Sequence, residues 1–582
     1  MMNKWREILY AIGIKFVMLV FGALILYLTL LSVYSTCVEA YRLYDDGNIG
    51  HYVYFLPDHP LKHLAVLCGF VVILLVAYYF QKKISIQQNM FVYVRVICIA
   101  FFVVSLGFIL LTRYKLASDP NKVMIAAYEF LSGDFHRFEP GEYMNKYPHQ
   151  SGFMLYMCGF ILAFGESSGL IMQITNAVVM AVAYYHIAKI VDLFWHQEKV
   201  VITTILLMAV SIPMIFYTTF VYGNFIGFMF AVMAIYQELM LFRDEKFYRI
   251  FLAAVFMALS IILKVNFLIT LIAMLIVGVI ELLQKGKSFL MLKFVGIVLL
   301  FCIVGNQLIT MVMSFALGFD LPKGLPATTY ITMGVEEGVV SPGSDNGASG
   351  DIYRDNNWDY DAANQAAKEE IAFVMGKYIR DWRKGVDFFG RKQASQWNEP
   401  SFQGFSILWG RENGYEAPKW IQSLVEGKSS IFLLELFNLS QTLVLAGVCF
   451  YLFLYRRERS LEELLFAVIF IGGFLFHTFW EAKSQYTMLY FLLLIPYMVK
   501  GYSLLLYYLS TILQKLKKKE VVIEKQLFIK RALVTICVII ILIPIVGRIC
   551  RMKTFHYIFA PVSDEELLMQ YEQQVDKIWN RE

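Results

Sequence analysis

The segment VRVICIAFFVVSLGFILLT, residues 94–112, is apolar along almost its whole length, and its single charged residue is Arg95. A helix of about 20 such residues crosses the hydrocarbon core of a bilayer, which is about 30 Å thick. Similar runs recur along the chain, whose 582 residues are 58% hydrophobic and 17% charged, with a mean hydropathy of +0.58. Because soluble proteins carry about 25% charged residues, the sequence predicts an all-α polytopic membrane protein.

Basic side chains in short loops mark the cytoplasmic side of a membrane protein. Keeping every basic cluster of this chain on that side gives a bundle of about 13 transmembrane spans. The clusters are the N-terminus with Lys4 and Arg6, then Lys82-Lys83, Arg243 to Arg249, Lys285-Lys287, Arg456 to Arg459 and Lys515 to Lys519. The predicted spans are residues 14–36, 63–80, 94–112, 168–190, 200–217, 225–242, 249–263, 267–283, 289–317, 431–454, 462–480, 486–508 and 530–550.

The apolar run SGFMLYMCGFILAFG, residues 151–165, is not counted among the spans. Apolar runs of about 10–14 residues are more often interfacial or re-entrant. If this run crossed the membrane, every later basic cluster would fall outside, so we expect a helix that lies on the outer membrane face. The N-terminus is then cytoplasmic and the C-terminus external, in a cell membrane that the chain crosses many times.

This threading divides the chain into five regions. Residues 1–93 hold two extra N-terminal spans, and residues 94–317 form a core membrane module with an external loop at 113–166. Residues 318–430 form a large extracytoplasmic loop, in which residues 361–377 have the apolar spacing of a helix. Residues 431–550 hold the C-terminal spans, and residues 551–582 form an extracytoplasmic tail. The eight cysteines are scattered, so we expect no disulfide framework and no CxxC metal site.

The external loop ASDPNKVMIAAYEFLSGDFHRFEPGEYMNKYPHQ, residues 117–150, is polar between two strongly apolar segments. Asp119 followed by Pro120 is typical of a helix start, with Asp119 as the N-cap. Apolar residues then recur at helical spacing, and Gly133 suits the C-terminal cap. Taken alone, Asp119 is a structural cap. A carboxylate just beyond a span also suits general-base catalysis, because partial burial raises its pKa and a fixed helix aims it.

The end of this loop, Tyr147-Pro148-His149-Gln150, is by itself a proline turn into the short apolar helix, with His149 as a polar cap. Taken together, the loop resembles the first external loop of the GT-C glycosyltransferases. The shared order is an Asp after the first core span, an amphipathic helix, the Gly133-Asp134 pair and the Tyr-Pro-His-Gln step. These membrane enzymes use polyprenyl-phosphate sugars. The branch that the chain most resembles is the family-thirty-nine-like proteins of bacteria, relatives of protein O-mannosyltransferases and of the aminoarabinose transferases of lipid A.

The resemblance continues downstream, so that it runs from residue 94 to residue 510. Two positions depart from the family pattern, because Asn224 stands where relatives often have an acidic residue and Gln485 where many have arginine. The first two spans and the last one lie outside the resemblance. The matching downstream segments are Tyr217 to Asn224, Leu263 to Asn266, Gly324 to Pro326, Ile331 to Gly334, Ser395 to Pro400 and Trp480 to Tyr486.

The resemblance implies an inverting transferase that moves a monosaccharide from a polyprenyl-phosphate sugar to an acceptor hydroxyl on the outer face. Asp119 is the implied general base, and Lys264 is the implied anchor for the leaving phosphate. Lys264 alone would be a lysine that reaches the interface, although a charge flanked by apolar sequence is costly unless it has a partner. The implied substrate contacts are Lys146, Tyr147, His149, Gln150, Tyr222, Asn224, Glu481, Lys483 and Gln485.

The implied partners are an undecaprenyl-phosphate-linked sugar, a glycan, lipid or protein acceptor of the cell envelope, and membrane lipids, without nucleic acid. Such a transfer requires no cofactor, and Asn224 argues against a divalent metal that bridges this position to Asp119. The acidic run from Asp345 to Asp361 lacks the spacing of an EF-hand, so we expect a solvated loop. Glu129, Asp134 and Glu481 are either secondary acids or solvated surface charges.

Three other functions remain open from the sequence. A transporter or flippase of polyprenyl-linked saccharides favours inverted repeats and spans broken at mid-membrane, and we find no clear internal repeat. A polysaccharide polymerase or ligase also uses a large outer loop, but it normally relies on arginines there. A non-catalytic receptor gains little support from the order of the motifs. Loss of sugar transfer without loss of lipid-sugar flipping separates a transferase from a transporter.

Overall fold

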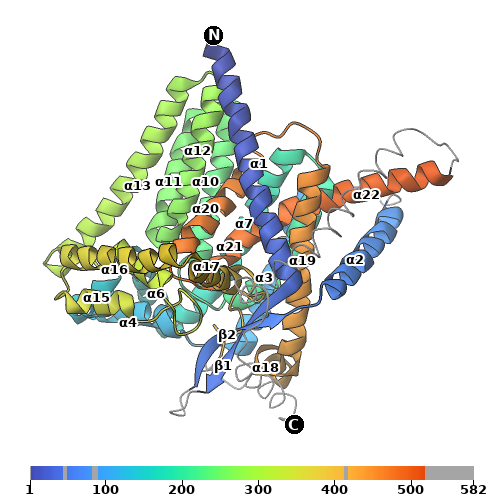
Figure 1. Ribbon diagram of the computed structural model, residues 1–582. Helices are drawn as coiled ribbons and strands as arrows, with labels where there is room; N and C mark the ends of the chain where they lie inside the picture. The colour runs from blue at the N-terminus through green and yellow to red at the C-terminus, as the bar shows by residue number, and fades with distance from the viewer. Residues whose placement is uncertain (1, 44–48, 82–88, 410, 412–416, 518–582) are drawn as a thin grey trace.

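The computed structural model describes residues 2–43, 49–81, 89–409, 411 and 417–517. Most of its long helices run side by side in one bundle (Figure 1). Within these residues, nine helical segments are long and apolar enough to cross a membrane, which confirms the prediction of a helical multi-pass membrane protein. Four predicted features lie wholly or partly outside the described residues: the span 530–550, the tail 551–582, the pair Lys82-Lys83 and the run Lys515 to Lys519.

The long helices coincide with most of the predicted spans. In lipid only a helix or a closed barrel pairs every backbone N–H and C=O group, which is why apolar runs of this length fold as helices. Two of the apolar helices, α11 and α20, are shorter than a full span. The helices are α1 (Met2–Tyr34), α2 (Pro60–Gln81), α3 (Met90–Thr112), α7 (Ser168–Trp195), α10 (Asn224–Asp244), α11 (Phe247–Leu263), α12 (Leu268–Gln284), α13 (Ser288–Leu317), α19 (Lys428–Leu454), α20 (Leu465–Phe479) and α22 (Ile495–Lys517).

Two predicted spans are interrupted rather than continuous. Residues 200–217 form α8 (Glu198–Ala209) and α9 (Ile212–Tyr217), and Ser211 between them is extended. Pro213 explains this break, because proline is tolerated in the first turn of a helix but not in its interior. Residues 486–508 begin with the 3-10 turn η5 (Ser484–Tyr486) and the short helix α21 (Met488–Leu492), which precede α22. Residues 488–514 are still among the nine segments of the described chain that are long and apolar enough to cross a membrane, whereas residues 200–217 are not.

The linker between α1 and α2 contains a β-hairpin that the all-α prediction does not include. Strands β1 (Ser35–Leu43) and β2 (Ile49–Pro57) pair antiparallel, and they form the one sheet in the described part of the chain. The large loop binds both strands. The Cys37 amide donates to the Asn398 carbonyl at 3.1 Å, and the Val53 amide donates to the Val340 carbonyl at 3.0 Å. Unpaired strand edges offer such groups to any neighbouring chain, and here the loop takes them up.

The first outer loop folds into short helices at one end of the bundle. They are α4 (Ser118–Ser132), the 3-10 turn η1 (His136–Phe138), α5 (Tyr143–Lys146), the 3-10 turn η2 (Pro148–Gln150) and α6 (Ser151–Phe164). Gly133 ends α4 in a left-handed conformation, as predicted. Gly165 ends α6 at φ 55°, and η3 (Gly165–Ser167) separates it from α7. The predicted separate helix at 151–165 is confirmed, and its placement on the outer membrane face stays a prediction.

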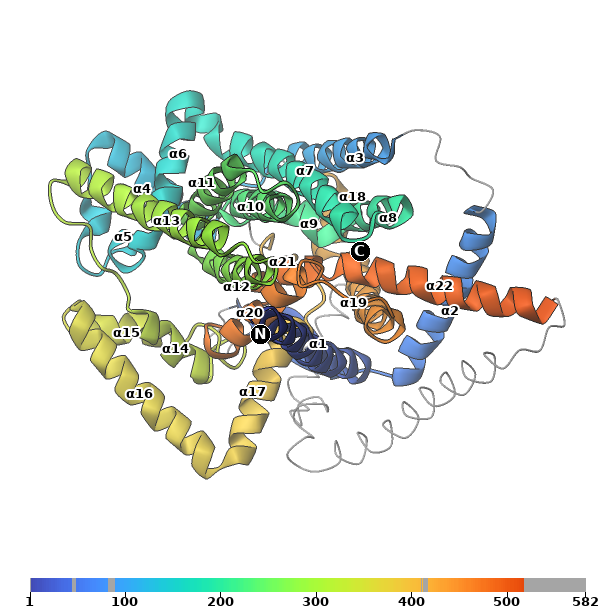
Figure 2. The ribbon, with the colours of Figure 1, turned by 90° about the horizontal axis from the view of Figure 1, so that it is seen from above.

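The large loop is mostly helical. It contains α14 (Ala327–Val335), α15 (Ala348–Asp355), α16 (Tyr360–Arg380), α17 (Trp382–Trp397) and α18 (Lys419–Glu426). The predicted helix at 361–377 is confirmed as α16, which the Asp359 carboxylate caps by accepting the Ala362 amide at 2.7 Å. Viewed from above, α16 and α17 form a V whose apex points away from the bundle (Figure 2).

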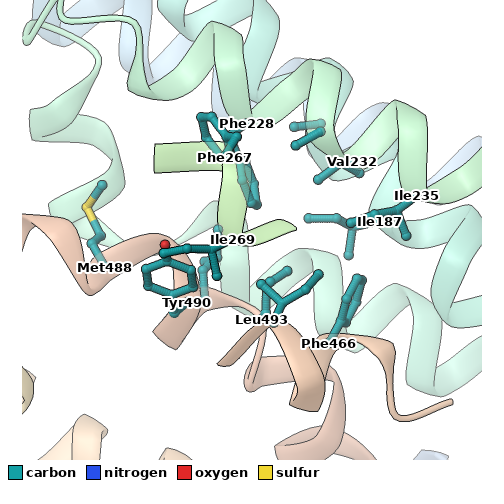
Figure 3. Packing of buried hydrophobic residues seen from close by; sticks show 14 of the residues in the cluster. Ile187, Phe228, Val232, Ile235, Phe267, Ile269, Phe466, Met488, Tyr490 and Leu493 are labelled. Atoms are coloured by element: carbon teal, nitrogen blue, oxygen red, sulfur yellow. The ribbon is translucent and has the colours of Figure 1, made fainter. Parts of the chain in front are cut away.

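One apolar core joins helices that are far apart in the sequence. Side chains from α7, α10 and α12 meet side chains from α20, α21 and the turn after it (Figure 3). Burying such side chains is the main favourable contribution to the association of these helices where they are shielded from lipid and water alike. The side chains labelled in Figure 3 are Ile187, Phe228, Val232, Ile235, Phe267, Ile269, Phe466, Met488, Tyr490 and Leu493.

Polar side chains from distant segments also meet at the end of the bundle that carries the N-terminus. The N-terminal end of α1 lies opposite the end that carries α4, α6 and the large loop (Figure 1). Near the N-terminus, the Tyr10 hydroxyl donates to the Glu281 carboxylate at 2.7 Å, and Lys285 pairs with Glu462 at 3.1 Å. Two predicted cytoplasmic positions, the N-terminus and Lys285, therefore share one end of the molecule. Which side of a membrane this end faces stays a prediction.

Candidate functional site

Six segments of the chain meet at the outer-loop end of the bundle. They are the first turn of α4, the start of α5, the end of η2, the turn before α10, the junction between α11 and the 3-10 turn η4 (Val265–Phe267), and the turn before η5 together with η5. Their polar side chains form a cluster that we call the Asp119 site. Its members are Asp119, Tyr143, Gln150, Tyr222, Lys264, Glu481, Lys483 and Tyr486.

Asp119 is not the cap of α4. The N-cap residue is Ala117, and Asp119 lies in the first turn without a capping hydrogen bond. Instead, its Oδ2 accepts the Tyr222 hydroxyl at 3.4 Å, and its Oδ1 lies 3.7 Å from the Lys122 ammonium. The carboxylate is 40% exposed, so a substrate can reach it. The predicted capping role is therefore wrong, because the carboxylate contacts the distant Tyr222 hydroxyl instead of a backbone N–H of its own helix.

Tyr222 holds the centre of the site. The side-chain amide of Gln150 donates to the Tyr222 hydroxyl at 2.7 Å, and the Tyr143 hydroxyl lies 3.4 Å away. Burial raises the pKa of Tyr222 well above its usual range, and the Asp119 charge raises it further. The phenol therefore keeps its proton. Because Gln150 already donates to the phenol oxygen, this proton is available to orient the Asp119 carboxylate.

Lys264 lies at the break between α11 and η4, in an extended conformation. Its ammonium is 3.6 Å from the centroid of the Tyr222 ring, which is a cation–π contact. No carboxylate in the described part of the chain comes within ion-pair distance of this ammonium. Burial lowers the pKa of Lys264 to about 7, although the nearby Asp119 charge acts in the opposite direction. An anion that binds next to Lys264 would therefore stabilise the charged ammonium.

Two glycines fix the position of the Lys264 backbone. A Cβ at Gly223, whose φ is 77°, would lie 2.4 Å from the Leu263 carbonyl oxygen. A Cβ at Gly152 would lie 2.5 Å from the Ile262 carbonyl oxygen. The start of α6 and the turn before α10 therefore both press on the last turn of α11. This close approach aims the next residue, Lys264, at Tyr222.

We expect Gly223→Ala to destabilise the protein and to displace Lys264. The new methyl group meets both an unfavourable φ and the Leu263 carbonyl, at a cost of roughly 1–3 kcal/mol or more. Gly133→Ala is the matched control, because Gly133 also has a positive φ but open space around it. Thermal unfolding in detergent measures both variants. Equal losses in melting temperature would show that the contact with Leu263 adds nothing to the backbone strain.

The turn before η5 contributes a paired charge. The Lys483 ammonium lies 2.7 Å from the Glu481 carboxylate, and the Tyr486 hydroxyl donates to the other Glu481 oxygen at 3.1 Å. Burial lowers the pKa of Lys483, but the Glu481 charge outweighs burial and the net pKa is well above its usual range. Lys483 is therefore a permanent cation with a partner, unlike Lys264.

A narrow slot of about 40 Å³ lies beside Lys264. Its polar lining is formed by Asn224, Lys264, Asn266, Thr270, Gln485 and Tyr486. A cation next to apolar walls suits an anionic group that carries hydrocarbon. The predicted contacts Asn224 and Gln485 thus line the same slot as Lys264. The apolar walls are formed by Phe228, Phe267, Ile469, Leu489, Tyr490 and Leu493.

The other predicted contacts from the first loop lie on its side facing the large loop. The Lys146 ammonium lies 5.4 Å from the centroid of the Trp358 ring. The Tyr147 ring is tilted against the Tyr143 ring with centroids 4.8 Å apart, and His149 lies next to Tyr147 and within electrostatic reach of Lys264. Tyr147 is thus one ring removed from the Asp119 site, whereas Lys146 is directed toward the large loop.

The predicted secondary acids of the first loop belong to a separate ion-pair group. Glu129 binds the Arg137 guanidinium at 2.8 Å, and Asp134 binds His136 at 3.0 Å. Glu129 lies ten residues after Asp119 on the same helix, or about 15 Å along its axis. Among the described residues, no three His, Cys, Asp or Glu side chains lie close enough together to hold a metal ion.

Sequence reasoning assigned no role to several residues at the end of the large loop. The buried Glu399 carboxylate accepts the Gln403 amide at 2.6 Å and the Ser484 hydroxyl at 2.9 Å. The Gln403 side chain accepts the Gln485 amide at 3.4 Å and donates to Glu39 of β1 at 3.2 Å. These contacts position the turn that carries Glu481 and Lys483. The motif Ser395 to Pro400 was visible in the sequence, but its partners were not.

Lys392 of α17 ties the large loop to the same turn. Its buried ammonium donates to the Trp480 carbonyl at 2.7 Å and to the Gly334 carbonyl of α14 at 2.5 Å. Tyr330 of α14 also stacks on Trp480, with ring centroids 4.8 Å apart. Burial lowers the pKa of Lys392 to about 7. Nothing in the surrounding sequence identifies this lysine, because its partners are backbone carbonyls.

We expect Lys392→Met to loosen the turn that carries Glu481. Methionine fills a similar volume but leaves the carbonyls of Gly334 and Trp480 without their donor, at roughly 1–3 kcal/mol per buried group. Hydrogen–deuterium exchange in residues 327–335 and 480–486 should then rise. Lys368→Met is the control, since Lys368 is an exposed lysine of α16. Unchanged exchange in both segments would mean that the ring stacking at Trp480 is sufficient.

Comparisons of the chain with protein-family models, with curated proteins and with solved structures give no match. The function therefore has to be argued from the residues of the Asp119 site and from the slot beside it.

Proposed function

We propose that the protein is an inverting glycosyltransferase of the GT-C type. It transfers a monosaccharide from a polyprenyl-phosphate sugar to an acceptor hydroxyl in the cell envelope. The acceptor is a glycan, a lipid or a protein, and the reaction takes place on the outer face of the cell membrane. The resemblance of residues 94–510 to this class and the geometry of the Asp119 site support the proposal together.

The observation that carries the proposal is the position of Lys264. Its ammonium has no carboxylate partner in the described chain, and it lines a small slot whose other walls are mostly apolar. A polyprenyl phosphate has the matching chemistry, with an anionic head on a hydrocarbon chain. Preorganised cations and donors near a leaving phosphate are worth roughly 2.7–4 kcal/mol each in the transition state. Lys483 adds a second positive charge nearby, although Glu481 partly neutralises it.

Asp119 fits the role of the general base. The carboxylate removes the proton of the acceptor hydroxyl as the hydroxyl oxygen bonds to the anomeric carbon of the donor sugar. The bond from that carbon to the phosphate oxygen breaks, and polyprenyl phosphate leaves with the electron pair. Glycosyl transfer passes through an oxocarbenium-like state, so positive charge develops on the sugar while negative charge develops on the phosphate. Asp119 contacts the Tyr222 hydroxyl and Lys264 contacts the face of the Tyr222 ring, so a carboxylate and an ammonium are both available at the site for this charge separation.

The experiment that tests the proposal is reconstitution of the purified protein in liposomes with a panel of undecaprenyl-phosphate sugars. Release of undecaprenyl phosphate, measured by mass spectrometry, reports turnover of the donor. NMR of the product reports its anomeric configuration, and we expect inversion. Bound donor lipids that are never released, in the presence of envelope extract as a source of acceptors, would reject a transferase.

A transporter of polyprenyl-linked sugars is the second candidate, and one observation favours it. Glu238 lies fully buried in α10, and within the described chain neither of its carboxylate oxygens has a hydrogen-bond partner. Ionisable residues inside spans often mark ion or substrate pathways. A flipping assay with a fluorescent lipid-linked sugar separates the two functions. Flipping that Glu238→Gln abolishes, with no sugar transfer in the parent protein, would favour the transporter.

A further inference from the structure

The corner between α16 and α17 exposes large apolar side chains. Ile379 is 77% exposed, Trp382 is 58% exposed and Phe373 is 53% exposed. The other face of α16 is packed, since Ala363, Ala367 and Val374 are buried. Residues 373–382 therefore expose two aromatic rings and an isoleucine within one short segment. Exposed apolar patches of this kind mark contact with a partner or a membrane.

The same corner carries a concentration of positive charge. Lys377 and Arg380 occupy the last turn of α16, and Arg383 and Lys384 the first turn of α17, all four exposed. Within residues 373–384 the one acidic residue is Asp381, which pairs with Lys384 at 3.5 Å. The Lys377 ammonium lies 3.8 Å from the centroid of the Phe373 ring. In contrast, the first half of α16 is acidic. The corner is thus an apolar tip inside a basic rim.

The fold puts this corner at the level where the bundle ends. Phe389 of α17 packs against Phe479, the last residue of α20, with ring centroids 5.9 Å apart. Lys392 binds the carbonyl of the following residue, Trp480. From this contact α17 runs outward to the apex of the V, which stands to the side of the bundle rather than over it (Figure 2). Beside a membrane-spanning bundle, this space at the end of the helices is the headgroup region of the bilayer.

We propose that the corner, residues 373–384, inserts into the membrane interface and binds anionic phospholipids. Tryptophan and phenylalanine partition to the boundary between headgroups and acyl chains. Lysines and arginines around them are attracted to negatively charged headgroups, by an amount that falls off within a Debye length. The corner matches both properties, and its net positive charge selects anionic over zwitterionic lipid. The inference does not depend on the proposed transfer reaction.

Helix α17 connects the corner to the turn that contributes Glu481 and Lys483 to the Asp119 site. α17 is a single helix from the corner at Trp382 to its C-terminal half, where Lys392 holds the Trp480 carbonyl. Glu481 and Lys483 follow directly after Trp480. Lipid bound at the corner therefore limits the movement of the same helix that positions this turn. Lipid at the corner and the Lys392 contacts would then hold the two ends of α17, and with them the turn that carries Glu481 and Lys483.

Photo-crosslinking in the full-length protein tests the proposal. p-Benzoylphenylalanine is placed at residue 379 in one variant and at residue 365 in the other. Gln365 is also exposed, on the same helix and on nearly the same face, about 21 Å earlier. Both proteins are irradiated in nanodiscs with equal amounts of phosphatidylcholine and phosphatidylglycerol. We expect phospholipid adducts at residue 379, enriched roughly fivefold in phosphatidylglycerol, and few adducts at residue 365.

A charge variant completes the test. R380Q/R383Q, combined with the probe at residue 379, should keep the lipid adducts but lose the enrichment in phosphatidylglycerol. Equal adduct yields at residues 365 and 379 would overturn the proposal, and so would enrichment that survives the charge variant. Protein–protein adducts at residue 379 instead of lipid adducts would assign the corner to a second copy of the chain, and the membrane contact would be rejected.

Discussion

Asp119→Asn should lower the rate of sugar transfer by roughly 10²–10⁴-fold, the usual contribution of a general base. Asparagine has the same shape and can still accept the Tyr222 hydroxyl, so the local structure should persist. It cannot remove a proton from the acceptor. The affinity for the donor lipid should change little, because Asp119 does not line the slot beside Lys264. Release of undecaprenyl phosphate under single-turnover conditions is the measurement.

Glu139→Gln is the control for this prediction. Glu139 is an exposed carboxylate of the same external loop, so its substitution removes the same charge from the same face. We expect normal transfer from this variant and an unchanged melting temperature from both. If Asp119→Asn transfers sugar at the parental rate, Asp119 is a surface residue that happens to contact Tyr222. A lower transfer rate in both variants would show that the total negative charge of the loop, and not Asp119 itself, supports the reaction.

Lys264→Met should lower kcat/KM for the donor by about 10²–10³-fold, the effect of losing one preorganised group that stabilises transition-state charge. Methionine retains the length and the contact with the Tyr222 ring but carries no charge. The loss should appear in donor binding as well as in turnover, because the phosphate is anionic in both states. Binding of undecaprenyl phosphate itself, measured without any sugar, is an independent readout of the same contact.

The pH dependence of kcat/KM gives a sharper test of Lys264. The pKa of this lysine in the free protein is lowered to about 7, so its ammonium is present below that pH and is lost as the pH rises through it. Because kcat/KM reports groups of the free enzyme, it should fall above pH 7. The fall in kcat itself should begin at higher pH, since a bound phosphate favours the charged form of the lysine.

Lys264→Arg decides whether this lysine is the titrating group. Arginine stays protonated at every accessible pH. The Lys264→Arg variant should therefore lose the alkaline fall in kcat/KM while it keeps part of the activity. A fall at the same pH in the arginine variant would assign the titration to another residue. Lys323→Met, which removes an exposed loop lysine paired with Asp361, should leave the profile unchanged.

The sequence predicted helices well where the signal is local. Apolar runs marked most of the spans, and the alanine spacing marked α16. The break between α8 and α9 was missed although Pro213 lies in the sequence, because apolar composition alone does not reveal where a run changes direction. The hairpin β1–β2 was also missed. Its edges are bound by Asn398 and Val340, and backbone pairing over such distances leaves no trace in the local pattern.

The sequence predicted only part of the candidate site, because contacts between distant segments leave no trace in the local pattern. The resemblance selected Asp119, Tyr222 and Lys264, and these residues come together in the fold. The partners that these side chains contact were not predicted. Asp119 looked like a helix cap because Asp before Pro usually is one, yet its contact is a tyrosine 103 residues away. Glu481 and Lys483 looked like two separate substrate contacts, and they turn out to bind each other.

By itself, the sequence determined that the chain forms apolar helices and that its polar motifs lie mainly in the loops between them. Both follow from side-chain hydrophobicity over windows of about 20 residues, which the bilayer selects directly. Only the tertiary structure decided which charges are paired. Glu481 has a cation within ion-pair distance, whereas no carboxylate of the described residues lies that close to Lys264, because the turn at Gly223 and the start of α6 hold the end of α11 against Tyr222. Charge pairing acts over a few ångströms, and distances of that size are set by packing between segments.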